Sequence, residues 1–357
     1  MIKPTMAFVD EHIHQLTKSG DFMMKILSEH FEVTRYWDDY YLTRKNVPLE
    51  ELNKYEYVFF WQTLNSIDEL KKITGKIIWV PLSDGYPDEF NLWKLLASDV
   101  PMKILSFSKK MTSVCERFGI PALTVKYYLN PVEFRFNIPK TGRHLFFWYR
   151  SNLYFKELKN IIFPAEIDSF IYRSNPDIAF ERELIDPSDI EKFKIKLVET
   201  KYTTRKEYFD LLSQANIFIS PRKKEGIGLS FIEAMAMGMV VIGYNNPTMN
   251  EYIKNGVNGY LFDRNTKKID FSDFDAVMDR SKKSAEAGYK EWLLAIPKII
   301  EYIKTPAPKP KRSTLSPIYR GLYEIEKHFP VWQRTFLRYA YKVQKKLTGR
   351  MGMRNDK

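Results

Sequence analysis

The fold is decided by residues 219 to 243, which read Ile-Ser-Pro-Arg-Lys-Lys-Glu-Gly-Ile-Gly-Leu-Ser-Phe-Ile-Glu-Ala-Met-Ala-Met-Gly-Met-Val-Val-Ile-Gly. The apolar run that ends at Ser220 predicts a strand, and the charged, glycine-containing stretch after it predicts a loop. Apolar spacing from Ser230 to Met237 predicts a helix, with Ser230 as its cap and Gly238 as the residue that ends it. Val240–Gly243 then predicts a second buried strand.

Two glutamates in this stretch stand out, because Glu225 lies in the predicted loop and Glu233 lies about one turn inside the helix. A loop of small residues before a helix presents free N–H groups and the positive end of the helix dipole, which suits a phosphate group. A carboxylate one turn deeper does not suit phosphate, but it can accept hydrogen bonds from a ribose diol. The pattern therefore indicates a nucleotide site.

These residues resemble the donor-site signature of retaining GT-B glycosyltransferases of the "glycosyl transferases group 1" type, close to family 4. The segments Glu225-Gly-Ile-Gly-Leu and Glu233-Ala-Met-Ala-Met-Gly match that signature, with Ile227 in place of the usual aromatic residue. The resemblance extends upstream to Thr203, through a helix and strand, and downstream through the run Pro247-Thr-Met-Asn-Glu-Tyr-Ile-Lys-Asn-Gly-Val-Asn-Gly-Tyr-Leu.

The resemblance implies roles for individual residues. Glu225 would be the catalytic residue near the donor sugar, and Glu233 would hold the ribose. Arg150 and Lys156 would bind the donor phosphates, although the family's glycine after this lysine is absent here. The backbone amides of the loop would line the sugar and phosphate, and these belong to Gly226, Ile227, Gly228 and Leu229. The resemblance also implies a metal-independent reaction and no cofactor.

The predicted fold is α/β: two Rossmann-like, doubly wound domains facing a central cleft, followed by a basic helical tail. We predict an acceptor-side domain at 1–138, a nucleotide-sugar-binding domain at 139–304, and a proline hinge with the tail at 305–357. Trp292–Lys304 would be the helix that crosses back to the first domain. Other predicted strands are Met6–Asp10, Glu32–Trp37, Tyr57–Trp61, Lys76–Leu82, Lys103–Phe107, Leu123–Tyr128, His144–Tyr149, Ile167–Tyr172 and Lys194–Val198, and other predicted helices are Asp21–His30, Lys109–Phe118 and Phe155–Ile162.

Three polar residues follow predicted strands of the first domain, on the side expected to face the cleft. His12 and His14 come after the first strand, and Asp84 comes after the fourth. We consider two interpretations for each: contact with the acceptor, or an ordinary loop position. A metal site at His12-Ile-His14 is not expected, because no third or fourth ligand has suitable spacing.

Composition describes a soluble, globular chain of 357 residues with 44% hydrophobic residues. The single cysteine, Cys115, indicates a reducing compartment. No targeting segment is recognisable, and no stretch has the roughly 18 apolar residues of a membrane span. We therefore expect a cytoplasmic protein, either free or held at a membrane surface.

Positive charge is concentrated in the tail. Residues 309–357 carry 13 Lys and Arg against three acidic residues, or +10 of the chain's total of +12. Two helices are predicted there, Pro317–His328 and Pro330–Leu347, and the second has an apolar and a basic face. Such a helix suits the anionic inner face of the plasma membrane, the alternative being that its apolar face packs on the enzyme.

The resemblance thus implies a retaining enzyme that moves a sugar from a nucleotide-sugar donor to a glycan or lipid-linked acceptor, in cell-surface polysaccharide biosynthesis of the lipopolysaccharide, O-antigen or capsule type. The alternative is a catalytically silent GT-B scaffold or partner subunit at the membrane. A nucleic-acid partner is not expected, because the chain has no base-reading module. Donor base, sugar, acceptor and linkage stay open.

Overall fold

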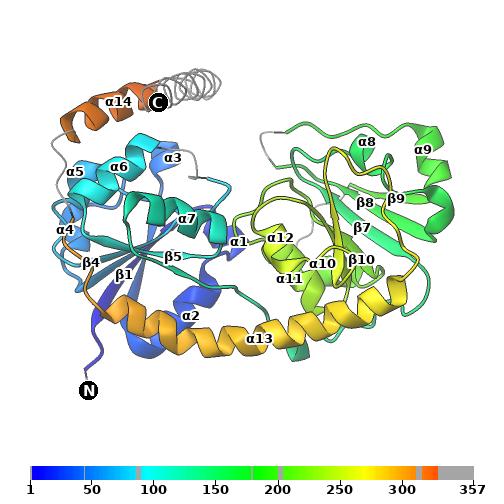
Figure 1. The fold of residues 1–357 in the computed structure, drawn as a ribbon, viewed down its shortest axis with the longest axis horizontal. Coiled ribbons are helices and arrows are strands. Elements are labelled where there is room, and N and C mark those ends of the chain that lie inside the picture. The colour runs from blue at the N-terminus through cyan, green and yellow to red at the C-terminus, as the bar shows by residue number, and fades with distance from the viewer. Residues whose placement is uncertain are drawn as a thin grey trace, which may run out of the picture.

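The computed structural model describes residues 2–43, 45–85, 90–177, 180–199, 204–310 and 316–328. These residues form two six-stranded sheets, each surrounded by helices (Figure 1). All the strand pairs are parallel, in the orders β2-β1-β3-β4-β5-β6 and β12-β11-β10-β7-β8-β9. The predicted α/β class with two doubly wound domains is therefore confirmed, whereas the domain limits at 138 and 304 stay predictions.

The first sheet consists of strands with apolar side chains on both faces, as expected of a sheet covered on both sides. Every residue of β3 (Tyr57–Trp61) and of β5 (Met102–Ser106) is buried. The other strands are β1 (Thr5–Glu11), β2 (Glu32–Asp38), β4 (Lys76–Val80) and β6 (Ala122–Thr124). The helices are α1 (His14–Thr17), α2 (Asp21–His30), α3 (Tyr40–Thr43), α4 (Leu49–Leu52), α5 (Ile67–Leu70), α6 (Phe90–Asp99) and α7 (Lys109–Phe118).

The second sheet is built from β7 (His144–Tyr149), β8 (Ser169–Ser174), β9 (Ile195–Val198), β10 (Ile217–Ile219), β11 (Val240–Tyr244) and β12 (Gly259–Phe262). Its helices are α8 (Phe155–Leu158), α9 (Pro187–Lys192), α10 (Arg205–Leu212), α11 (Leu229–Ala236) and α12 (Met249–Tyr252). Short 3₁₀ turns lie at Pro131–Phe134 and Pro164–Glu166. The loop that carries Glu225 therefore follows the carboxyl end of β10, as predicted.

Ser230 does not cap α11, which corrects the prediction. The helix begins at Leu229, and its N-cap is Gly228 with φ at 80°. Glycine is required there because a Cβ would lie 1.9 Å from Cε1 of Phe231, and because the backbone is left-handed. Gly238, at φ 83°, ends the helix as predicted. Other predicted limits were also too long, since β4 ends at Val80, β6 at Thr124 and α8 at Leu158.

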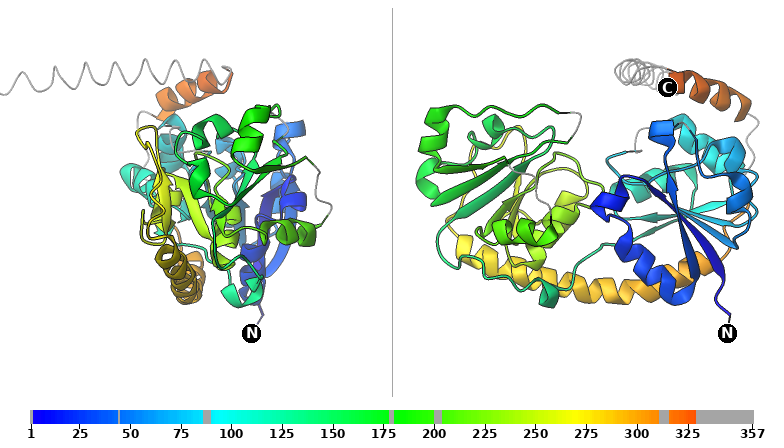
Figure 2. Two further views of the ribbon diagram at one scale, coloured as in Figure 1. Left: turned by 90° about the vertical axis from the view of Figure 1, so that its right-hand side faces the viewer. Right: turned by 180° about the vertical axis from the view of Figure 1, so that it is seen from behind.

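Helix α13 (Phe274–Lys304) has 31 residues and runs along one edge of both domains (Figures 1 and 2). The predicted crossing helix is its last part. Its end is fixed to the first sheet by Lys103, a buried residue of β5 whose Nζ donates to the carbonyl oxygens of Tyr302, Ile303 and Thr305. The same ammonium group lies 4.5 Å from the ring centroid of Tyr302.

The two domains share one apolar cluster that contains buried residues of both sheets and of α13. Aromatic rings connect them: Tyr127 lies 5.1 Å from Trp292 of α13, and Tyr128 lies 5.1 Å from Tyr252 of α12. Burial of apolar surface in the contact between the two domains favours a closed arrangement of the domains.

Helix α14 (Ser316–His328) packs on α6 of the first domain. Ser316 Oγ lies 2.9 Å from Ser98 Oγ, and Arg320 forms ion pairs with Asp68 and Asp99. The first predicted tail helix is therefore confirmed, but it rests on the protein. The second, Pro330–Leu347, lies outside the described residues. Among the helices that the structure describes, none is long and apolar enough to cross a membrane.

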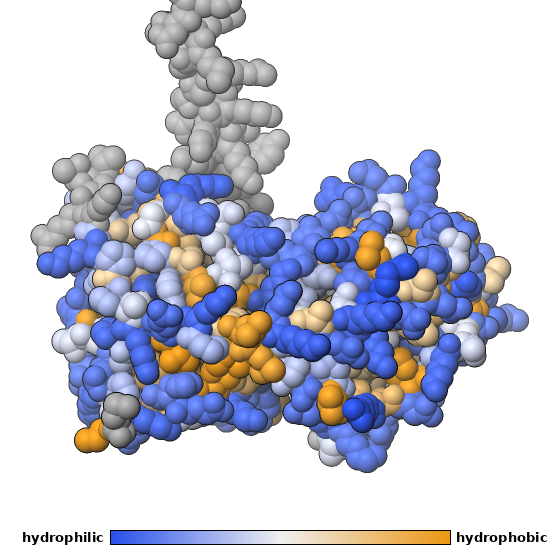
Figure 3. Space-filling view, turned by 60° about the horizontal axis from the view of Figure 1, so that its bottom comes forward, coloured by the Kyte–Doolittle hydropathy of each residue, from blue (hydrophilic) through white to orange (hydrophobic). Residues whose placement is uncertain are grey.

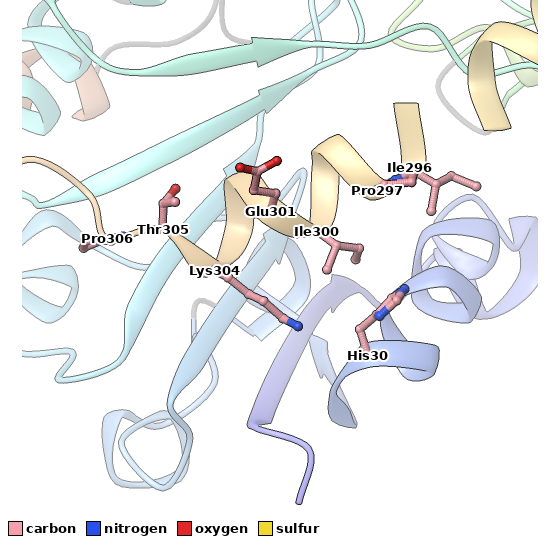
Figure 4. A pocket seen from close by; sticks show the side chains of 8 residues that line it. All are labelled: His30, Ile296, Pro297, Ile300, Glu301, Lys304, Thr305 and Pro306. Atoms are coloured by element: carbon pink, nitrogen blue, oxygen red, sulfur yellow. The ribbon is translucent and has the colours of Figure 1, made fainter. Parts of the chain in front are cut away.

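A groove of about 660 Å³ opens beside the last part of α13, between His30, Ile300 and Lys304 (Figure 4). Apolar surface is visible on the face along which α13 runs (Figure 3), and Leu293 and Leu294 of this helix are exposed. None of the residues that line the groove is a predicted site residue, so it is separate from the site described next.

Candidate active site

Glu225 is buried at the end of the loop between β10 and α11. Its residue surface is only 7% exposed, and its Oε1 atom has no hydrogen-bond partner among the described residues. Burial raises the pKa of Glu225 to about 7, although Arg222 and Arg150 oppose the shift; Asp84 and Asp177 reinforce it. A buried carboxyl group with a free oxygen and a raised pKa is typical of a functional site.

Two arginines share one carboxylate beside Glu225. Arg150, which follows β7, donates from Nε and Nη2 to Oδ1 of Asp177, both at 3.0 Å. Arg222 donates from Nη2 to Oδ2 of the same residue. Asp177 thus holds both guanidinium groups in place. The two arginines and the one aspartate together bring a net positive charge to the loop. Such an array suits a diphosphate.

Asp177 was missed in the sequence analysis. It lies three residues after β8, at the same edge of the sheet as Arg150. The rule that ligands bind at the carboxyl ends of parallel strands would have drawn attention to it. Its pairing with Arg222, however, is a tertiary contact across 45 residues, and no local pattern indicates it.

Lys156 makes no hydrogen bond or ion pair with these residues in the part of the chain that the structure describes. It is exposed on α8, and its Nζ lies 5.3 Å from the ring centroid of Tyr154. Lys223, next to Arg222, forms an ion pair with Glu157 at 2.6 Å. The structure therefore brings Arg150 and Arg222 to Glu225, while a phosphate role for Lys156 stays a prediction.

Glu233 is buried in α11 and pairs with a residue that the sequence analysis did not single out. Its Oε1 accepts a hydrogen bond from Nη2 of Arg205, the first residue of α10, at 2.6 Å. Burial raises the pKa of Glu233, and the charge of Arg205 opposes the shift. The Arg205 side chain is 60% exposed, so the pair can be reached from solvent.

The loop after β4 of the first domain closes on the loop of Glu225. Ser83 Oγ donates to the carbonyl oxygen of Glu225 at 2.9 Å. A Cβ atom on Gly226 would lie 2.5 Å from Cδ1 of Leu82 and 2.9 Å from Oδ1 of Asp84. Close contact between the domains therefore requires glycine at position 226. Asp84 is partly open to solvent. Its partial loss of hydration nevertheless raises its pKa, although the positive charges of Arg222 and Lys224 oppose this shift.

The two histidines have separate partners. His14 is buried, and its Nδ1 lies 2.5 Å from Oδ1 of Asp10. His12 is half exposed and lies 2.7 Å from Asp39. Glu11, directly before His12, ends β1; burial raises the pKa of Glu11, with His14 opposing the shift and Asp84 adding to it. Glu11 was missed in the sequence analysis. Acceptor contacts by His12, His14 and Asp84 stay predictions.

Comparison with known structures identifies the class of fold. The crystal structure of Anabaena Alr3699/HepE in complex with UDP and glucose is similar over 84% of this chain and 99% of that chain, with a TM-score of 0.55 and 11% identity. The lipopolysaccharide outer core galactosyltransferase WaaB, in its apo form, is similar over 90% of this chain and 99% of that chain, with a TM-score of 0.50 and 12% identity. The chain has the GT-B fold.

One segment of the sequence also matches a known family. Residues 181–289 match the family described as "Glycosyl transferases group 1", and they include Glu225 and Glu233. An "Alpha-1,6-glucosyltransferase" of Actinobacillus pleuropneumoniae serotype 7 (strain AP76) is 37% identical over 73 residues, which are 20% of this chain and 22% of that protein. The matched stretch thus spans about a fifth of that relative. A segment of this GT-B chain is therefore similar to group 1 glycosyltransferases.

Proposed function

We propose that this protein is a retaining, metal-independent hexosyltransferase that uses a nucleotide-diphosphate sugar as donor. The observation that carries the proposal is the pair of guanidinium groups held by Asp177 next to the buried carboxyl group of Glu225. A departing nucleoside diphosphate needs cations at fixed positions, and preorganised groups of this kind stabilise the charge that develops on the leaving group.

In this proposal Arg150 and Arg222 bind the diphosphate, with the amides of Gly226 to Leu229 at the N-terminus of α11. Glu233 accepts hydrogen bonds from the ribose diol, and Glu225 lies against the donor sugar. The bond between the anomeric carbon and the diphosphate oxygen breaks, and the bond to the acceptor oxygen forms on the same face. The acceptor's proton passes to the departing phosphate, so atoms and charges balance without another reactant.

The acceptor would bind at the strand ends of the first domain, where His12, His14, Asp84 and Glu11 lie. We propose a glycan or lipid-linked acceptor in the synthesis of a cell-surface polysaccharide. The names of an α-1,6-glucosyltransferase and a lipopolysaccharide galactosyltransferase among the similar proteins support a hexosyl transfer of this type. We further propose that the protein works as a peripheral protein at the inner face of the plasma membrane, to which the basic segment 309–357 binds.

Donor binding is the direct test. Calorimetry with UDP-, GDP- and other nucleotide sugars should identify one that binds, and Glu233→Ala should weaken its binding by about 10- to 100-fold, since a charge-assisted hydrogen bond contributes roughly 1.5–3 kcal/mol. Glu286→Ala, at an exposed position of α13, is the matched control. Wild-type affinity in Glu233→Ala would contradict the assignment of the ribose site.

Turnover separates the enzyme from a silent scaffold. Hydrolysis or transfer of the donor that binds should continue in the presence of EDTA, because the two arginines carry the charge of the diphosphate in this proposal. Binding without any turnover would favour the scaffold. Loss of activity with EDTA that is restored by Mg²⁺ or Mn²⁺ would show that a metal ion does the work assigned to the arginines.

A further inference from the structure

Helix α12 belongs to the second domain, between β11 and β12, but its polar groups bind the first domain. The carboxylate of Glu251 accepts the backbone N–H of Lys109 with both oxygens, at 2.9 and 3.0 Å, and the hydroxyl of Ser108 at 3.0 Å. Glu251 of the second domain therefore caps the N-terminus of α7 in the first domain. Tyr252 adds a second link, because its hydroxyl accepts the N–H of Tyr127 at 3.0 Å.

Thr248, the residue before α12, has a strained backbone. Its φ is 77° and its ψ is −67°, and a positive φ is rare for a β-branched residue. The residue is completely buried. Strain of this kind persists where the surroundings impose it, and it gathers at functional positions. A glycine would adopt this conformation freely, so the threonine side chain must contribute something that glycine lacks.

The hydroxyl of Thr248 connects the two loops that meet at the candidate active site. Its Oγ1 lies 2.8 Å from Oγ of Ser83, in the loop after β4, and donates to the carbonyl oxygen of Gly226 at 3.2 Å. Ser83 in turn donates to the carbonyl oxygen of Glu225. We call the loop between β10 and α11, which carries Glu225 and Gly226, the donor loop. Two of its neighbouring peptide groups are thus held by a pair of buried hydroxyls, one from each domain.

We propose that Thr248 is a positioning residue that couples closure of the two domains to the geometry of the Glu225–Gly226 loop. This inference rests on the proposed function, because that loop is the proposed sugar site. When the domains separate, Ser83 leaves with the first domain, so the carbonyl group of Glu225 loses its donor and the hydroxyl of Thr248 loses the neighbour that orients it against Gly226. The donor loop is therefore in its working position only when the cleft is closed.

Substitutions can separate the hydroxyl from the strain. Thr248→Val removes the hydroxyl and keeps the β-branched shape, Thr248→Gly removes both the hydroxyl and the strain, and Thr248→Ser keeps the hydroxyl. Ser83→Ala removes the partner in the first domain. Thr266→Val is the matched control, because among the described residues the hydroxyl of Thr266 bonds only to Asp263, in the loop after β12.

We expect kcat/KM to fall roughly 10- to 100-fold in Thr248→Val and in Thr248→Gly, as for a misplaced reacting group. Thr248→Gly should still unfold at or above the wild-type temperature, because its backbone is relaxed. A role in stability alone would instead spare activity in Thr248→Gly. Thr248→Ser and Thr266→Val should stay close to wild type. Ser83→Ala combined with Thr248→Val should be no worse than either alone.

Wild-type kcat/KM in Thr248→Val, or losses that multiply in the double variant, would overturn the proposal. X-ray scattering of the full chain supplies a readout that does not depend on catalysis. The radius of gyration should increase in Ser83→Ala and Thr248→Val relative to wild type and Thr266→Val, and unchanged curves would also overturn it. If the wild-type protein transfers no sugar at all, the proposed function fails. Scattering then still decides whether the hydroxyls of Ser83 and Thr248 hold the two domains together.

Discussion

At the scale of single residues, the candidate site places a buried carboxyl group, which lowers the stability of the folded state when it is charged, next to two arginine side chains. Burial raises the pKa of Glu225 from 4.5 to about 7, so the folded protein holds a proton that the unfolded chain releases between these values. The folded state therefore loses stability as pH rises from 4.5 to 7, by a total on the order of 3 kcal/mol. Functional sites commonly carry such a cost.

The first prediction is that Glu225→Gln is more stable than the wild type at pH 8 and equally stable near pH 4.5, because glutamine has no charge to bury. Denaturant unfolding across this pH range measures the difference. The same variant should lose sugar transfer at both ends of the range. A difference in stability that does not change with pH would contradict a raised pKa for Glu225.

The second prediction concerns the three consecutive cations of the donor loop. These are Arg222, Lys223 and Lys224. Arg222 faces Asp177 and Glu225, whereas Lys223 is paired with Glu157. Arg222→Gln should weaken binding of the cognate nucleoside diphosphate by at least about tenfold, as for a lost charged hydrogen bond. Lys223→Gln should change it little, and the free nucleoside should bind both variants alike. Equal effects of the two substitutions would contradict the assignment.

At the scale of elements, local signals predicted most of the fold. The strands Tyr57–Trp61 and His144–Tyr149 and the helices Asp21–His30 and Lys109–Phe118 have the predicted limits, because apolar runs and helix-ending residues mark them. The first half of α13 was not predicted, because its buried face includes Ser281, Ala285 and Gly288, small residues that give only a weak apolar pattern. Asp177, Arg205 and Glu11 were missed for a related reason, because their roles follow from partners that are distant in sequence.

The third prediction tests how α13 is fixed to the first domain. Lys103→Met removes the ammonium group that binds the last carbonyl oxygens of the helix, and we expect a loss of about 1–3 kcal/mol in the free energy of unfolding. Hydrogen exchange should accelerate in the last turn of α13. Lys298→Met, at an exposed position of the same helix, should change the stability by less than about 0.5 kcal/mol. Equal stability of both variants would show that packing alone holds the helix.

At the scale of the whole molecule, helix α14 has one side that faces the first domain and one that faces outward. Helix α14 turns Tyr319 and Arg320 toward the first domain, whereas Ile318 and Leu322, one turn apart, are 58% and 46% exposed on its outer side. In Figures 1 and 2, α14 and α13 lie at opposite edges of the first domain. Residues 329–357, which follow α14, carry a net charge of +7. An exposed apolar pair that continues into a basic segment matches an anionic membrane surface.

The fourth prediction is that the full chain binds vesicles containing phosphatidylglycerol, and that binding weakens as salt rises, because each basic residue near such a surface contributes about 1 kcal/mol. A chain that ends at His328 keeps α14 and its contacts with α6, so it should fold and bind the donor normally while losing most vesicle binding. Ile318→Asp with Leu322→Asp should reduce vesicle binding in the full chain without changing donor affinity. Turnover of a lipid-linked acceptor should fall with vesicle binding, whereas donor hydrolysis should not. Undiminished vesicle binding by the shortened chain would place the membrane contact elsewhere, and unfolding of that chain would show that residues 329–357 stabilise the enzyme.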